Sequence, residues 1–192
     1  MSAGPRPGVW LDFDGVVNAM SKPDRSVWSD WVSFDFRAGQ QVYPVSYSPT
    51  VVRFVSALAQ VADVVWFTDW LKLTERFPAE IPGMPALPWL RRPRQEALDA
   101  FTGPRRYTGE PWWKYVVAHD IHADRPRLWI DDLLDHFHPA YKETRHWADH
   151  RHPGVFCVAP NENVGLTPRP MRIIAEHLAD LGHPMPDWRT PA

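Results

Sequence analysis

Near its start the chain reads Gly8-Val-Trp-Leu-Asp-Phe-Asp-Gly15, a short apolar run that closes on two acids and a glycine. A short apolar run bounded by turn-forming residues is typical of a strand covered on both faces. Asp12 and Asp14 stand two positions apart, so in an extended chain both carboxylates project to the same side. Gly15 permits a tight turn and a close approach of the backbone to a ligand. We therefore expect a buried strand with a polar site at its carboxyl end.

The same pattern recurs along the chain, and segments with helical spacing alternate with it. Further apolar runs cover 62–69, 127–132 and 154–159, and helices are expected at 51–61, 112–121 and 169–181. Strands that alternate with helices predict an α/β fold, here a Rossmann-like three-layer sandwich with a mainly parallel central sheet. The carboxyl ends of the strands form the ligand crevice of such a sheet. Polar residues cluster at those ends in this sequence, which is the first indication of function.

Residues 18–50 interrupt the alternation directly after the first strand. Two segments within them, Trp31–Arg37 and Gln41–Tyr47, flank a turn near Ala38-Gly39, and apolar and polar residues alternate in the first of them. Such alternation around a glycine-containing turn predicts a β-hairpin. We expect this hairpin to form a flap beside the crevice.

Residues 71–111 form a second interruption, which is rich in proline and irregular, with room for a short strand near Leu87–Leu90. The chain of 192 residues has the size of one ordinary domain, and its apolar content of 44% is that of a globular protein. We therefore expect a single domain over residues 1–192, with a flap at about 18–50, an irregular insert at about 71–111 and no full cap domain.

Composition and charge exclude several classes of partner. The net charge of -2 gives no electrostatic reason to expect nucleic acid or an acidic membrane as a general partner. The sequence contains no run of about 18 apolar residues, and its start lacks the apolar stretch of a signal peptide. Cys157 is the single cysteine and cannot form an internal disulfide, which favours a reducing compartment. These features predict a cytoplasmic protein that does not associate with a membrane.

The stretch Leu11-Asp-Phe-Asp-Gly15 resembles the first motif of the haloacid dehalogenase-like (HAD) superfamily, hydrophobic-Asp-x-Asp-Gly. The three further motifs of that superfamily have counterparts here in the right order. Thr68 ends the next strand, Lys114 stands near the start of a later helix, and the pair Asp131-Asp132 ends a further strand. The two acidic motifs are specific, whereas the threonine and the lysine are persuasive only by their positions.

This resemblance covers roughly residues 9–166 and implies a capless, phosphatase-type member of the superfamily. It implies a Mg²⁺-dependent phosphomonoester hydrolase in which Asp12 attacks phosphorus and forms an aspartyl-phosphate. Asp14 would protonate the leaving oxygen and then activate water. Lys114 would neutralise charge on the nucleophile and the phosphoryl group, and Thr68 and Asp69 would help to bind phosphate oxygens.

The resemblance also implies a set of metal ligands. Mg²⁺ would be held by the Asp12 carboxylate, the backbone carbonyl of Asp14 and one acid of the Asp131-Asp132 pair, of which Asp132 is the favoured direct ligand. Asp135, which follows the pair, is expected to orient Lys114 or to cap the following helix.

Two other functions remain open at this point. A polynucleotide-end or nucleotide phosphatase is one, because flap aromatics could stack on bases and the clusters Arg91–Arg94 and Arg105-Arg106 could bind further phosphates. A non-catalytic module that binds a phosphorylated ligand is the other, although the presence of both Asp12 and Asp14 argues against it. The histidine-rich stretch 136–152 has no cysteine partners and no His-Glu-x-x-His pattern, so we expect its histidines to be solvated or locally hydrogen-bonded.

Overall fold

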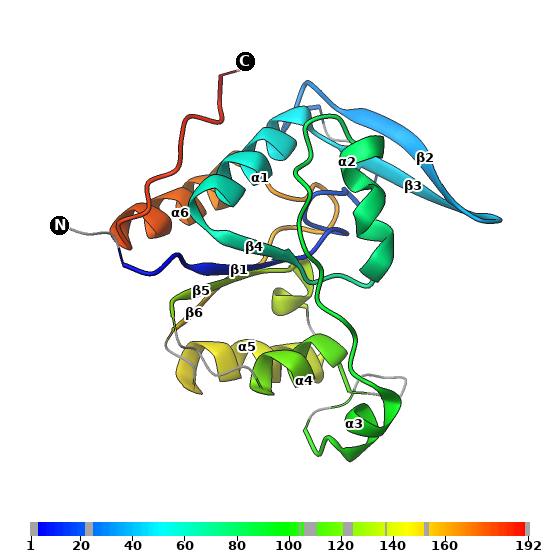
Figure 1. Cartoon of the computed structure of the whole chain (residues 1–192), viewed down its shortest axis with the longest axis vertical. Coiled ribbons are helices and arrows are strands. Elements are labelled where there is room, and N and C mark those ends of the chain that lie inside the picture. The colour runs from blue at the N-terminus through cyan, green and yellow to red at the C-terminus, as the bar shows by residue number, and fades with distance from the viewer. Residues whose placement is uncertain are drawn as a thin grey trace.

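Four parallel strands form the central sheet of the computed structural model, in the order β4-β1-β5-β6 (Figure 1). The strands are β1 (Gly8–Leu11), β4 (Asp63–Trp66), β5 (Arg127–Ile130) and β6 (Val155–Val158). The structure describes residues 4–21, 25–103, 105, 111–120, 125–136, 138–151 and 154–190. The predicted α/β class and the mainly parallel sheet are confirmed.

Alternating side chains of the short strands build two separate cores, one on each face of the sheet. In β1, Val9 and Leu11 join a cluster on one face, and Trp10 joins a cluster on the other face. Helices α1 and α6 cover the first face, and α4 and α5 cover the second (Figure 1). These helices span Pro49–Val61 (α1), Pro168–Asp180 (α6), Trp113–Asp120 (α4) and Pro139–Arg151 (α5). Every strand is therefore covered on both sides, which explains the continuous apolar runs of the sequence.

A two-stranded antiparallel hairpin, β2 (Val32–Ala38) and β3 (Gln41–Tyr47), follows β1. Gly39 takes a positive φ of 62° at its turn, a conformation that glycine adopts without strain. The inner side of the hairpin is packed rather than free, because Phe36 is fully buried against Trp70. Residues 22–24, which belong to the expected flap segment, lie outside the described residues.

The proline-rich segment contains the 3₁₀ helix η1 (Leu71–Arg76) and the short helices α2 (Phe77–Glu80) and α3 (Gln95–Ala100). In place of the strand expected near Leu87–Leu90, the chain makes one isolated parallel bridge to the edge strand β4. The N–H of Trp66 donates to the Pro88 carbonyl at 2.8 Å, and the N–H of Leu90 donates to the Trp66 carbonyl at 2.9 Å. Residues 104 and 106–110 of this segment lie outside the described part of the chain.

None of the helices within the described residues has the length and apolarity needed to cross a bilayer.

Candidate active site

The polar ends of three neighbouring strands meet at the carboxyl edge of the sheet. Asp12 follows β1 directly, Thr68 follows β4 by two residues, and Asp131 follows β5. The chain passes from β1 to β4 on one side and then crosses to β5 on the other side of β1. Such a reversal of strand order opens a crevice outside the carboxyl ends, where parallel α/β sheets bind their ligands. The topology therefore brings together residues that are up to about 120 positions apart.

Lys114 reaches this edge from the first turn of α4 and lies between two carboxylates. Its Nζ is 2.5 Å from Oδ2 of Asp12 and 2.6 Å from Oδ2 of Asp131. The lysine side chain is only 1% exposed. Burial favours the neutral amine, but the charges of the two acids outweigh that effect and raise the pKa of Lys114 above its ordinary value. The ammonium is therefore a permanent charge at this site.

The carboxylate of Asp131 has three partners within the protein. Besides Lys114, its carboxylate accepts hydrogen bonds from the N–H of Leu133 at 3.1 Å and from Nε1 of Trp129 at 3.4 Å. The first of these caps a short 3₁₀ helix, η2 (Asp132–Asp135). Burial raises the pKa of Asp131, and the nearby ammonium of Lys114 opposes that shift.

Of the two roles expected for Asp135, the orientation of Lys114 is wrong, and the capping of the following helix stays a prediction. Oδ1 of Asp135 lies 3.6 Å from Nη1 of Arg145, which is on α5, and the residue that holds Lys114 is Asp131. The physical reason is the turn of η2, which carries the chain one turn away from the sheet edge before Asp135 is reached.

Three carboxylates, those of Asp12, Asp131 and Asp132, gather so closely that one oxygen of each lies within 4.8 Å of the others. The described part of the chain offers the Asp132 carboxylate no hydrogen bond or ion pair to another residue. Burial, and then the charges of Asp131 and Asp12, raise the pKa of Asp132 to about 8. One ammonium does not balance three carboxylates, so the group fits a divalent cation. An all-oxygen donor set suits Mg²⁺ and other hard cations alike.

Gly15 is the residue that lets Asp132 approach the first motif. Its φ is +67°, and a Cβ placed on it would lie 2.3 Å from Cγ of Asp132. Any larger residue would combine an unfavourable backbone conformation with a direct collision. The glycine of the Asp-x-Asp-Gly motif thus makes room for the fourth motif.

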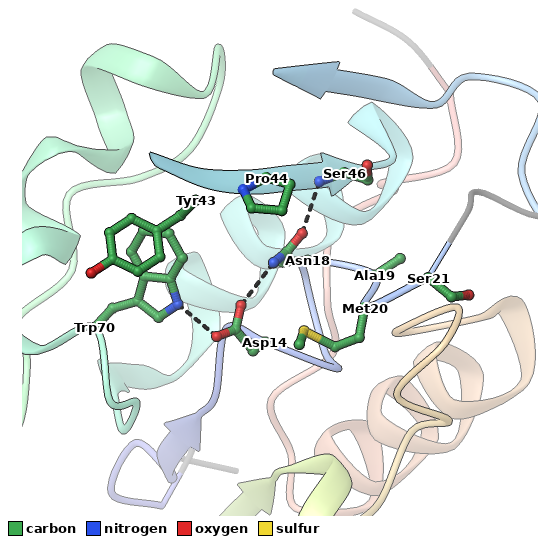
Figure 2. Close-up of a pocket in the computed structure, with 9 residues that line it drawn as sticks. All are labelled: Asp14, Asn18, Ala19, Met20, Ser21, Tyr43, Pro44, Ser46 and Trp70. Carbon is green, nitrogen blue, oxygen red and sulfur yellow. Dashed lines mark hydrogen bonds between the residues drawn. The ribbon is translucent and has the colours of Figure 1, made fainter. Parts of the chain in front are cut away.

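Asp14 occupies a different environment from Asp12 and does not belong to the carboxylate group. Its Oδ1 accepts a hydrogen bond from Nδ2 of Asn18 at 2.7 Å, and its Oδ2 accepts one from Nε1 of Trp70 at 2.8 Å (Figure 2). Burial raises the pKa of Asp14, although both of these donors oppose the shift. Asn18 also accepts a hydrogen bond from the N–H of Ser46, which ties this acid to strand β3.

A pocket of about 410 Å³ lies beside the Asp14 carboxylate, between the first-motif loop and the hairpin (Figure 2). The residues that line it are Asp14, Asn18, Ala19, Met20, Ser21, Tyr43, Pro44, Ser46 and Trp70. Trp70 thus both lines this pocket and holds the Asp14 carboxylate. No local pattern indicated its bond to Asp14, because the two residues are 56 positions apart.

Thr68 and Asp69 stand beside the cluster with different surroundings. Thr68 is buried, and its Oγ1 accepts a hydrogen bond from the N–H of Trp70 at 3.4 Å. Asp69 is exposed, and its carboxylate accepts a hydrogen bond from Nε1 of Trp113 at 2.6 Å. That bond joins the end of β4 to the residue just before Lys114. The roles of Thr68 and Asp69 in binding phosphate stay predictions.

The other groups considered from the sequence have local partners or lie apart. Nδ1 of His138 accepts a hydrogen bond from the N–H of Ala140, and Arg91 lies over the ring of Trp89 at 5.8 Å. Where side chains are described, the only group of three histidines, cysteines or acids spaced for a metal is the one at Asp12. Arg106, His152 and the side chain of His150 lie outside the described part.

No protein-family model matches this chain, and no curated protein matches it with significant similarity. Membership of the HAD superfamily therefore stays a prediction from the four motifs.

Proposed function

We propose that the chain is a HAD-like, Mg²⁺-dependent phosphomonoester hydrolase that acts through an aspartyl-phosphate on Asp12. The observation that carries the proposal is the position of Lys114 between Asp12 and Asp131 at the carboxyl edge of a parallel sheet, next to Asp132, which has no partner among the described residues. Burial of an ammonium and two carboxylates costs free energy of desolvation. We propose that Lys114 is retained here because its charge stabilises a dianionic phosphoryl group bound at Asp12.

Two contacts fix the carboxylate of Asp12, the proposed nucleophile. Its Oδ1 accepts a hydrogen bond from the N–H of Phe13 at 2.7 Å, and its Oδ2 lies against Lys114. In the first step an oxygen of Asp12 bonds to phosphorus while the ester P–O bond breaks, and Asp14 gives its proton to the leaving oxygen. In the second step water gives a proton to Asp14 and attacks phosphorus, which frees Asp12 and releases inorganic phosphate.

The raised pKa of Asp14 suits the first of these roles, because a general acid must carry a proton before it can donate one. Asp12 and Asp14 thus divide the work according to their surroundings. Thr68 and the backbone N–H groups near it are proposed to bind phosphoryl oxygens.

Asp132 and Asp12, with the backbone carbonyl of Asp14, are proposed to hold Mg²⁺. Asp131 is assigned a different task, because its carboxylate is already occupied by Lys114 and by the cap of η2, whereas that of Asp132 has no protein partner in the described part. When bound, Mg²⁺ would act as a Lewis acid and reduce the repulsion between Asp12 and the phosphoryl group. The hairpin β2–β3 is proposed to serve as a partial flap, since Tyr43, Pro44 and Ser46 form one wall of the pocket beside Asp14.

The test is hydrolysis of p-nitrophenyl phosphate with Mg²⁺. Asp12→Asn is expected to lower kcat by on the order of 10⁴-fold, because an amide does not replace the nucleophile. Asp35→Asn, on the exposed side of β2, makes the same change away from the site and should leave kcat unchanged. Circular dichroism should show that both variants are folded.

Removal of the metal gives an independent readout. EDTA should abolish turnover, and added Mg²⁺ should restore it. Turnover that is indifferent to the chelator would contradict the metal assignment, and wild-type rates in Asp12→Asn would contradict the nucleophile. Tight binding of orthophosphate without turnover of any ester would instead favour a module that only binds phosphorylated ligands.

A further inference from the structure

We infer that the pocket beside Asp14 receives the leaving group of the substrate and selects phosphomonoesters of uncharged alcohols with a flat, apolar body, such as aryl or benzyl alcohols. The inference rests on the proposed function and adds a substrate class to it. It concerns the 410 Å³ pocket between the first-motif loop and the hairpin (Figure 2).

The position of the general acid decides which part of the substrate enters this pocket. Asp14 must stand next to the leaving oxygen, because it gives that oxygen a proton. Asp14 lines the pocket, whereas Asp12 and the buried Lys114 that contacts it are not among the lining residues. The phosphoryl group therefore belongs at Asp12, and the organic part of the ester belongs in the pocket.

The charge of the described lining is unfavourable for an anionic leaving group. Asp14 is the one acid among the described residues that line the pocket, and no lysine, arginine or histidine accompanies it. A second phosphate or a carboxylate on the leaving group would lose its hydration without meeting a counter-charge.

The polar groups of the lining are already paired within the protein. The Asn18 amide is shared between Asp14 and the N–H of Ser46, and Nε1 of Trp70 is bonded to Asp14. The hydroxyl groups have partners as well, in that Ser21 bonds to the Asn163 carbonyl, Ser46 to Ser33 and Tyr43 to Gln41.

A polyhydroxylated leaving group, such as a sugar, would therefore lose bonds to water and find few free partners in this pocket. The surface that remains for a ligand is apolar. Met20, Ala19 and Pro44 contribute it together with the rings of Tyr43 and Trp70, whose centroids are 5.1 Å apart. A flat apolar group can fill such a pocket.

A second pocket, next to Asp132, adds no lysine or arginine among the described residues that line it. This pocket, of about 380 Å³, also contains Asp135, Glu162 and His136. Its excess of acids is unfavourable for the further phosphates of a polynucleotide. Both neighbours of the reacting centre thus favour a small ester whose only phosphate is the one that is removed.

The experiment compares kcat/KM for benzyl phosphate, 4-carboxybenzyl phosphate, glucose 6-phosphate and acetyl phosphate, in which the leaving group is small. The wild type is expected to favour benzyl phosphate over its carboxylated analogue and over the sugar phosphate by roughly tenfold or more. A preference for 4-carboxybenzyl phosphate or for glucose 6-phosphate, or no discrimination among these three esters, would overturn the inference while leaving the proposed function in place. Turnover of none of the four would overturn both.

A variant then tests whether the pocket itself is the cause. Met20→Lys places a cation on the pocket wall, at a side chain that is 57% exposed and can change without loss of the fold. The ratio of kcat/KM for 4-carboxybenzyl phosphate to that for benzyl phosphate should rise about tenfold. Val42→Lys makes a comparable change on the hairpin outside the pocket, at a side chain 45% exposed, and should not alter the ratio. An equal ratio in the two variants would show that the leaving group does not occupy this pocket.

Discussion

The two acids of the first motif lie two residues apart, yet their surroundings differ in kind. Asp12 belongs to a buried, charged region in which the ammonium of Lys114 joins it to Asp131. Asp14 belongs to a half-open, neutral region in which an indole and an amide are its hydrogen-bond donors. The ammonium of Lys114 lies against the Asp12 carboxylate, whereas burial raises the pKa of Asp14 in spite of its two neutral donors. Two such different surroundings on one short loop are what the proposed roles of nucleophile and general acid require.

The charged region should respond most strongly to change. Lys114→Met removes the only ammonium from between two buried acids, so kcat should fall by on the order of 10³-fold or more. The free energy of unfolding should fall by about 3–5 kcal/mol, because two buried carboxylates are then left facing each other. Activity assays and urea unfolding of the metal-free protein measure the two effects.

Lys142→Met provides the matched control, since Lys142 is exposed on α5. It should leave both quantities close to the wild type. If Lys114→Met were as stable and active as Lys142→Met, the charged region would have no role in catalysis or folding.

Gly15 allows Asp132 to approach the first-motif loop closely, and a substitution there should disturb this contact. Gly15→Ala would drive a Cβ into the Asp132 carboxylate, so the affinity for Mg²⁺ should fall by about 10- to 100-fold. Gly39→Ala carries the same backbone penalty, with φ +62°, but its Cβ would meet nothing within 4 Å. Calorimetric titration with Mg²⁺ should therefore separate the two variants. Equal affinities would mean that Asp132 does not bind the metal.

The neutral region should respond more weakly. Trp70→Phe keeps an aromatic ring against Phe13 and Phe36 but removes the N–H that holds Asp14. We expect kcat to fall by roughly tenfold with little change in KM, because the acid is misplaced while its proton remains. Trp89→Phe removes a similar indole bond, to Glu75, away from the site, and should leave kcat unchanged.

The sheet and the edge at which the site lies could be predicted from the sequence, because the strands carry strong local signals. The apolar runs predicted all four strands of the sheet to within a few residues, and the polar residues at their ends predicted the edge where the site lies. Helix α5 was not predicted from its sequence, PAYKETRHWADHR, which has few apolar residues. It is held against the sheet by only a few of them, among which Tyr141 and Trp147 are buried.

The division of labour between Asp131 and Asp132 was harder to predict. Because strand side chains alternate, Asp131 shares the face of Trp129, where α4 brings Lys114. Asp132 is then turned toward Gly15 on the first-motif loop. The alternation of side chains along the strand predicts this division only when it is also known that α4 covers the face of Trp129. Contacts such as that of Trp70 with Asp14 depend on the packing of distant segments and leave no periodic trace.

Asp30 offers a comparison for the two factors that set the pKa of Asp14, which are burial and hydrogen bonds from neutral donors. Its carboxylate accepts bonds from Oγ of Ser48 at 2.6 Å and Oγ1 of Thr50 at 2.7 Å, at the start of α1. Burial is the largest single effect and would raise the pKa of Asp30, but the hydrogen bonds together outweigh it and lower the pKa. A carboxyl with a lowered pKa stabilises the fold above its unfolded value, and this contribution is lost as the pH falls through the folded value.

Asp30→Asn should therefore reduce the free energy of unfolding at neutral pH by no more than about 1 kcal/mol, since solvent screens a group so little buried. The difference from the wild type should shrink as the pH is lowered through the pKa of Asp30. Urea unfolding at several pH values between about 3 and 7 measures it. A difference that does not change with pH would mean that the donors hold Asp30 equally well in both protonation states. The opposite shift at Asp14 would then require a cause other than its deeper burial.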